Sequence, residues 1–409
     1  MVDSVSLALI ISGLIILIGF LANYLFIKTG LPDMLILIFI GVIFGPILGA
    51  FNPTVIQSFA PFIAALALAY ILFDGGMGLN IRKVILNSPR AILLSVLTFV
   101  LSVLGVAVLM IIVFNVPLLY GLLFGSIFGG SSSIAVISLA TKIKISEKGA
   151  TILILESAIT DILCIVISLS LLDVIVTGKA NIDVIGLGIA EKFLIGAVIG
   201  LALGLAWLFA LKRVACIPFS YMLTLGIVLL GYAASESLGG SGALSALLFG
   251  LILGNEREIL SKISRKKGKN GIDWKNEKIY CSVDKGLKRF EAEVAFLIRT
   301  FFFVFLGIIV SISSLTVLLI GIVISIILLG ARFGAVWIST LKSSIQKERQ
   351  ILTVVFTRGL AAAVLATLPG QYGLSYSDLF VGLAVVVIVT TAIITTIGSM
   401  AISRKRARS

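Results

Sequence analysis

Residues 149–172 read GATILILESAITDILCIVISLSLL, an apolar run with two carboxylates, Glu156 and Asp161, near its middle. The run is long enough for a helix that crosses the hydrocarbon core of a bilayer, which is about 30 Å thick. An ionisable side chain at that depth is costly to insert, so it indicates a function and needs a partner. This stretch therefore predicts a membrane helix with functional ionisable side chains in its interior.

The composition of the whole chain agrees with a bilayer environment. Of its 409 residues, 59% are hydrophobic and 12% are charged, whereas about a quarter of the residues of a soluble domain are charged. The net charge of +13 would suggest nucleic-acid binding in a soluble protein, but basic cytoplasmic loops explain it in a membrane protein. We expect membrane lipids, and no nucleic acid, around this chain.

Apolar runs separated by glycine, proline or charge predict thirteen membrane segments. They indicate an all-α polytopic protein of the cell membrane, with residues 1–409 forming a single transmembrane domain. The first run follows no basic region and has no small-residue cleavage site after it, so it is expected to be a retained span. The segments are 5–27, 31–50, 56–73, 89–114, 117–141, 149–172, 188–211, 219–237, 240–254, 291–312, 314–339, 350–368 and 378–402.

The distribution of basic residues predicts the orientation. With the C-terminal tail inside and the N-terminus outside, 27 of the 32 Lys and Arg residues fall in cytoplasmic connections, two fall outside, and three lie within segments. One missed or extra segment would destroy this asymmetry, because every later connection would change sides. Two of these regions are distinctive, the basic loop 255–290 and the basic tail 403–409. The loop is either a segment lying near anionic headgroups or a regulatory one, and the sequence leaves both open.

Apart from Arg299, five ionisable residues are singled out within or at the end of a predicted membrane segment. Asp74 ends the third segment, Glu156 and Asp161 lie in the sixth, and Arg332 and Arg358 lie in the eleventh and twelfth. Two arginines and three carboxylates cannot all form one-to-one ion pairs. Burial favours the protonated form of an unpaired carboxylate, which can then exchange its proton for a cation.

The two carboxylates of the sixth segment are expected to face different neighbours, since five residues turn a helix by about 140°. Ser157 precedes Asp161 by one turn, so a hydroxyl and a carboxylate share a face and can converge on one ion. Glu156 needs an arginine, and spacing alone cannot choose between Arg332 and Arg358. Arg299, about two turns into the tenth segment, is long enough to extend toward the cytoplasmic interface, and we assign it no role.

Gly129-Gly130-Ser131-Ser132-Ser133 in the fifth segment is a poor helix core. Glycine adds backbone freedom and the hydroxyls compete for backbone partners, so the helix is either broken there or forms a small-residue packing seam. A broken helix at membrane depth is tolerated where it lines a cavity, and its carbonyls can then bind ions.

The chain contains no histidine, and this argues against an enzyme. There is no Ser/His pair, no glycine-rich phosphate loop followed by Lys and Ser or Thr, and the three cysteines have neither disulfide nor metal-ligand spacing. We expect no cofactor and no metal beyond a transported ion.

Four groups of residues, taken in order along the chain, resemble the monovalent cation/proton antiporter superfamily, in its sodium/proton exchanger-like, NhaP-type branch. The acidic end of the third segment is similar to that family's, and so are the sixth-segment motif and the glycines of the ninth. The tenth-segment aromatic run and the twelfth-segment Arg-Gly complete the set. These motifs are Ile71–Gly76, Glu156–Asp161, Gly239–Gly242 with Gly250–Asn255, and Thr300–Gly307 with Thr357–Leu360.

The resemblance implies an inverted-repeat fold in which the fifth and twelfth helices are broken and cross, and a homodimer. It implies that Asp161 carries the cation or the proton, with Ser157, Thr160, Ser131 and Ser132 around it. It also implies a structural ion pair of Glu156 with Arg332, and supporting roles for Asp74, on the cytoplasmic approach, and Arg358.

Two positions depart from the family pattern. Thr160 stands where the family has Asn, and Ser131-Ser132 align with its Thr-Asp. With one site carboxylate fewer, cations should bind more weakly unless hydroxyls and carbonyls compensate. Exchange of Na⁺ or K⁺ for H⁺ is the function that the resemblance implies, with the ion undecided. A cation channel and a transporter-derived sensor on the same scaffold are the alternatives.

Overall fold

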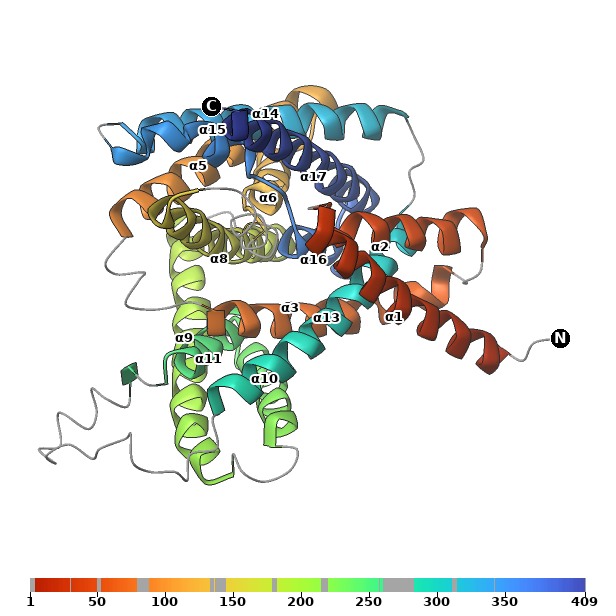
Figure 1. The fold of residues 1–409 in the computed structure, drawn as a ribbon. Coiled ribbons are helices and arrows are strands. Elements are labelled where there is room, and N and C mark those ends of the chain that lie inside the picture. The colour runs from red at the N-terminus through yellow and green to blue at the C-terminus, as the bar shows by residue number, and fades with distance from the viewer. Residues whose placement is uncertain are drawn as a thin grey trace, which may run out of the picture. The chain divides into compact units, whose positions relative to one another are not determined.

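All regular secondary structure in the described part of this chain is helical (Figure 1). A computed structural model describes residues 4–29, 31–49, 53–78, 88–132, 136, 145–178, 182–214, 220–256, 258–259, 283–310, 315–341 and 343–408. Most of the basic loop 255–290 lies outside these residues. The tail predicted at 403–409 continues the last helix, α17 (Ser377–Arg408), up to its end.

The helices fall into two compact units, built from residues 1–64, 87–179 and 299–409 and from residues 65–86 and 180–298. The first unit contains α1 (Ser4–Thr29), α2 (Asp33–Val42), α5 (Ser88–Phe114), α6 (Leu118–Phe128), α8 (Glu147–Thr177), α14 (Leu315–Ser339), α15 (Arg349–Val354), α16 (Leu360–Gln371) and α17. A π-helical turn, Ile43–Ile47, extends α2 around Pro46, and a 3₁₀ turn, Ser344–Glu348, precedes α15.

The second unit contains α9 (Ile182–Val214), α10 (Ser220–Ser237) and α11 (Gly242–Gly254). Two helices divide between the units, α3 (Pro53–Gly78) and α13 (Val283–Ile309). Within the second unit α11 packs closely on α9, where Gly200 meets the carbonyl of Ser245. Asp74 is half-buried on the α3 part of this unit.

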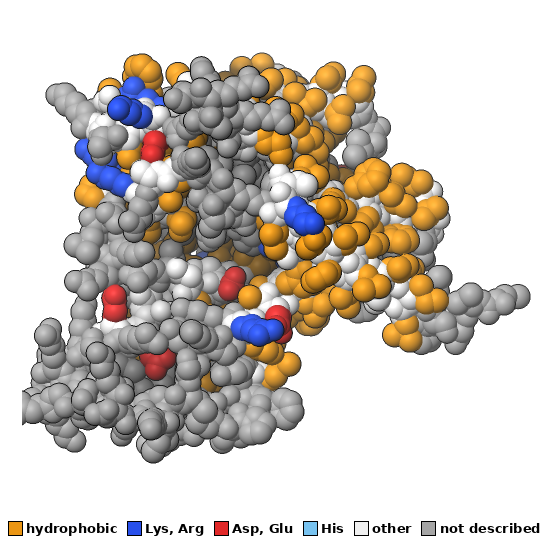
Figure 2. Space-filling view, viewed as in Figure 1, with side chains coloured by type: hydrophobic (Ala, Val, Ile, Leu, Met, Phe, Trp, Pro, Cys, Tyr) orange, Lys and Arg blue, Asp and Glu red, His pale blue; other side chains and the backbone are white. Residues whose placement is uncertain are grey.

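Seven helices of the described residues are long and apolar enough to cross a membrane, and six shorter apolar helices accompany them. Each of the thirteen predicted segments overlaps one of these helices, although the number of actual crossings stays a prediction. Apolar side chains also cover much of the outer surface, as Figure 2 shows over the region of α1 and α2. Leu17 and Phe20 of α1, for example, are 68% and 67% exposed. A surface of this kind fits lipid.

In the first unit, α14 illustrates how such a helix has one face for lipid and one for protein. Ile324, Leu328 and Arg332 recur every four residues and are fully buried, while Ile326 and Phe333 are exposed. The helix packs against α5 and α17 through the buried face. That face carries Arg332 into the interior of the unit.

Candidate functional site: a crossing beside a buried ion pair

The fifth and twelfth segments are both interrupted, and the two non-helical stretches meet in the folded chain. Helix α6 ends at Phe128, and the described residues after it, 129–132, are not helical. Helix α15 ends at Val354 and α16 begins at Leu360, which leaves residues 355–359 outside any helix. The backbone N–H of Ser132 donates to the carbonyl of Thr357 at 2.7 Å, so the two interruptions meet. We call residues 129–132 and 355–359 the crossing.

Gly359 is required for this close approach. A Cβ at Gly359 would lie 2.5 Å from the Cβ and Oγ of Ser132. Any other residue at position 359 would push the two segments of the crossing apart. The Arg-Gly pair in the twelfth segment therefore has a physical basis, since the glycine admits the fifth segment.

Two threonines of α17 replace the helical hydrogen bonds that the crossing lacks. The backbone N–H of Arg358 donates to Thr391 Oγ1 at 3.1 Å, and that of Phe356 donates to Thr395 Oγ1 at 3.4 Å. Thr395 in turn donates to the carbonyl of Val354 at 2.9 Å. Buried backbone groups need such partners, and side chains of α17 supply them here.

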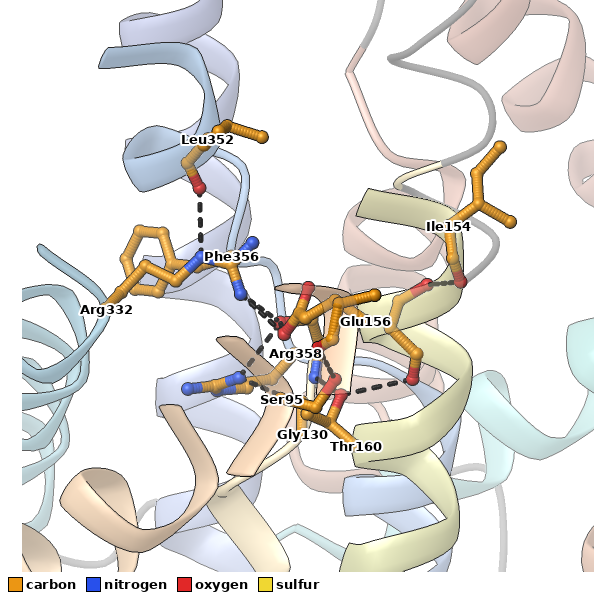
Figure 3. Close-up of polar contacts among 12 residues, drawn as sticks. Ser95, Gly130, Ile154, Glu156, Thr160, Arg332, Leu352, Phe356 and Arg358 are labelled. Atoms are coloured by element: carbon orange, nitrogen blue, oxygen red, sulfur yellow. Dashed lines mark hydrogen bonds and ion pairs between the residues drawn. The ribbon is translucent and has the colours of Figure 1, made fainter. Parts of the chain in front are cut away.

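Beside the crossing, Glu156 of α8 pairs with Arg332 of α14 (Figure 3). Arg332 Nη1 lies 2.5 Å from Glu156 Oε1, and both side chains are 0% exposed. Arg332 Nε also donates to the carbonyl of Leu352, at 2.9 Å. The structure thus joins Glu156 to Arg332, the pairing that the sequence alone left open against Arg358.

Arg358 instead donates from Nη1 to the carbonyl of Gly130, at 2.5 Å. This carbonyl follows the C-terminal end of α6, where the helix dipole favours a positive charge. The Nε and Nη2 atoms of Arg358 are buried and find no hydrogen-bond partner among the described residues. Arg358 also lies within electrostatic range of Glu156, Asp161 and Arg332.

Ser131 lies between these charges. Its Oγ is 3.3 Å from Glu156 Oε1, 3.4 Å from Arg332 Nη1 and 3.5 Å from Arg358 Nη1. Its backbone N–H donates to Thr160 Oγ1 at 3.2 Å, which ties the crossing to α8. Ser131 and Thr160 therefore hold the crossing against the ion pair.

The remaining predicted site residues lie on α8. Ser157 is fully buried and its Oγ donates to the carbonyl of Ile154 at 3.0 Å, so its oxygen keeps lone pairs to offer. Asp161 lies one turn further along and is half-buried, in contrast to Glu156. Among the described residues, no three acidic, Cys or His side chains group together as for a tightly bound metal. A cation near Asp161 would need hydroxyl and carbonyl oxygens as additional ligands.

Sequence reasoning missed an ion pair of Arg299, a residue to which it assigned no role. The Arg299 side chain is 13% exposed, and its Nη2 lies 2.8 Å from Oδ2 of Asp33, a residue that the sequence did not single out. The signal was present, because an arginine within an apolar segment requires a partner. Its partner belongs to a distant segment, however, and spacing could not identify it.

Comparisons with known proteins agree with this architecture. The transmembrane sodium/hydrogen exchanger family matches residues 13–403. The solved structure of the sodium proton antiporter MjNhaP1 from Methanocaldococcus jannaschii at pH 8 aligns with a TM-score of 0.74 at 21% identity, over 98% of each chain. At that identity the similarity shows the fold, which is the antiporter fold that the resemblance implied.

Two curated relatives are similar in sequence. The "K(+)/H(+) antiporter NhaP2" of Shewanella sp. strain ANA-3 is 28% identical over 404 residues, which cover 96% of this chain and 66% of the relative. The "Probable Na(+)/H(+) antiporter 2" of M. jannaschii is 27% identical over 302 residues, which cover 70% of this chain and 66% of the relative. The matches thus span just under two thirds of the length of these relatives.

The family match covers nearly the whole chain, and the fold is that of a solved antiporter. The chain therefore belongs to the transmembrane sodium/hydrogen exchanger family, and it is a multi-pass protein of the cell membrane.

Proposed function

We propose that this chain is a secondary antiporter that exchanges Na⁺ or K⁺ for H⁺ across the cell membrane, with cation and proton competing for Asp161. The observation that carries the proposal is the contrast between the two carboxylates of α8. Glu156 is fully buried and neutralised by Arg332, whereas Asp161 is partly exposed on the same helix. One carboxylate maintains the structure and the other is accessible for exchange.

Ion coordination in this proposal combines Asp161 with neutral oxygens. Ser157, one turn before it, offers its hydroxyl, and Ser132 offers another from the crossing. Ser131 and Thr160 act mainly by holding the crossing to α8. Because Ser132 stands where the family has a carboxylate, one proton for one monovalent cation is the stoichiometry that leaves the site's charge unchanged.

The choice between Na⁺ and K⁺ is left to experiment. The relatives' names include both K(+)/H(+) and Na(+)/H(+) antiporters, and hydroxyl ligands suit either ion. The family and these names favour exchange over the channel and sensor alternatives. Family membership also supports transport without covalent catalysis, and we propose that the working unit is a homodimer.

Proton flux in sealed proteoliposomes tests the function. A pH-sensitive dye inside the vesicles would report flux when Na⁺ or K⁺ is added separately, with Asp161→Asn as the control. Flux with one or both cations that disappears in Asp161→Asn supports antiport and identifies its substrate. A conductance far above carrier turnover would identify a channel, and absence of flux with either cation would contradict antiport.

A further inference from the structure

Asp33 and Arg299 form a second ion pair in the first unit, distinct from Glu156 and Arg332. Their side chains are 6% and 13% exposed. Asp33 begins α2, and its Oδ1 accepts a hydrogen bond from the backbone N–H of Met34 at 3.0 Å. Oδ2 faces Arg299 at 2.8 Å. The start of α2 thus fixes one carboxylate oxygen, and among the described residues Arg299 is the charged group that holds the other.

Close backbone contact between α2 and α13 fixes the positions of Asp33 and Arg299 relative to each other along the two helices (Figure 1). A Cβ on Gly41 of α2 would collide with the carbonyl of Val304, and one on Gly307 of α13 would collide with the carbonyl of Ile38. Helices in such close contact cannot slide past each other easily. Movement at this ion pair is therefore confined to the long Arg299 side chain.

A small cavity connects this pair to the crossing. Its volume is about 20 Å³, and its polar lining comes from Asp33, Arg299 and Ser132, with Phe26 and Phe303 among the apolar residues around them. A space of this size has room for one water molecule, and three polar groups are enough to bind it. Since Ser132 belongs to the crossing, the cavity is a polar connection between the pair and the proposed ion site.

The predicted topology places both charges at the cytoplasmic ends of their segments. Asp33 follows the basic connection at Lys28, and Arg299 follows the basic loop 255–290. Both connections are predicted to be cytoplasmic. The cavity therefore lies on the route from the cytoplasm toward the crossing.

The two ion pairs described above differ in how readily they can open. Glu156 and Arg332 are 0% exposed, and separating them would leave two charges buried in protein. Asp33 and Arg299 keep some contact with their surroundings, and an arginine near a polar interface can extend toward it. Of these two pairs, the partly exposed one is the one that can break and reform during transport.

We propose that Arg299 gates the cytoplasmic access path to the crossing, and that an entering monovalent cation binds Asp33 when Arg299 moves away. While the pair is closed, the guanidinium repels a cation and occupies the carboxylate. Once it is open, the carboxylate attracts the cation into the cavity beside Ser132. The identity of the ion rests on the proposed function, but the gate does not.

Thiol labelling tests the gate independently of transport. The reporter is Ser132→Cys in a chain with Cys216→Ser and Cys281→Ser, while Cys164, 1% exposed, is retained. A membrane-impermeant, positively charged thiol reagent is added at the cytoplasmic face of inside-out vesicles. The closed cavity is too small for the reagent, so labelling is slow. Arg299→Gln should accelerate it about tenfold, equivalent to about 1.4 kcal/mol, whereas Arg299→Lys should not.

The matched control is Arg289→Gln on the same helix, which removes an exposed pair with Glu293 and should leave labelling unchanged. An unchanged rate in a folded Arg299→Gln protein would overturn the gate. If Arg299→Gln fails to fold, the double variant Asp33→Asn with Arg299→Gln is used in its place, because it removes both charges of the pair. Slow labelling in this double variant would overturn the gate equally.

Transport kinetics test the role of Asp33. Asp33→Asn should raise the cation concentration that gives half-maximal exchange severalfold, with the maximal rate largely kept. A purely structural pair would instead reduce the amount of folded protein and leave the half-maximal concentration unchanged, which would overturn cation binding at Asp33. If the unmodified chain exchanges neither Na⁺ nor K⁺, the proposed function fails, while the labelling result still decides whether the gate exists.

Discussion

Glu156 and Asp161 lie on one helix, yet their environments differ and indicate a structural role for one and a transport role for the other. Glu156 is buried with an arginine 2.5 Å away and a serine hydroxyl close by. Asp161 is half-buried and lies within electrostatic range of Arg358. Loss of one should affect folding, and loss of the other should affect transport.

Asp161→Asn should abolish cation/proton exchange while leaving the protein folded. The amide resembles the protonated carboxyl in size and carries no charge, so it cannot exchange a proton for a cation. Proteoliposome flux measures the exchange, and gel filtration with thermal unfolding confirms folding. Retained exchange in this variant would exclude Asp161 as the exchanging residue.

Glu156→Gln should destabilise the protein, because it leaves Arg332 buried without a counter-charge. Breaking comparable buried pairs costs about 3–5 kcal/mol. Unfolding in detergent micelles would measure the loss, and it should exceed that of Glu293→Gln, which removes an exposed pair. Equal stability of Glu156→Gln and the unmodified protein would contradict a structural role for the pair.

Ser132→Asp should tighten cation binding, since it restores a negative charge at the crossing. The expected result is a lower cation concentration for half-maximal exchange, and Ser132→Asn, of similar size but neutral, is the control. If both variants bind cations equally, the charge at position 132 does not reach the ion.

At the scale of elements, the crossing depends on the absence of a side chain. Gly359→Ala would place a Cβ 2.5 Å from Ser132, and overpacking of this kind costs about 1–3 kcal/mol. The variant should lose both stability and exchange, as thermal unfolding and flux would show. Gly330→Ala on α14 meets nothing within 4 Å and should change neither. Similar behaviour of the two glycine variants would mean that the crossing tolerates displacement.

The sequence predicted much of this arrangement, for identifiable reasons. Hydropathy located the segments because a segment that crosses the hydrocarbon core needs a long apolar run. Gly129–Ser133 indicated either a break or a packing seam in the fifth segment, because glycine and serine disfavour a helix interior, and the family resemblance favoured the break. Pairings could not be predicted in the same way. Nothing local to Glu156 selects Arg332, and nothing local to Arg299 indicates Asp33, because each pair joins segments that meet only in the folded chain.

At the scale of the whole molecule, the predicted orientation can be tested directly. Thr177 and Leu341 are exposed at helix ends on opposite predicted sides. With Cys216 and Cys281 replaced by serine, Thr177→Cys should react with an impermeant thiol reagent only from outside the cell. Leu341→Cys should react only from the cytoplasm. Labelling of both from the same side would require a different number of crossings between them.

The threonine contacts of α17 have a mechanical consequence. Three hydrogen bonds, from Phe356, Arg358 and Thr395, fasten the non-helical part of the twelfth segment to this one helix. A net contribution of roughly 0.5–1.5 kcal/mol each is modest singly, but all three would have to break together for the crossing to leave α17 behind. We therefore expect the crossing and α17 to move as one rigid body in any conformational change during transport. Distance labels placed on each should keep a constant separation while both shift against a fixed reference.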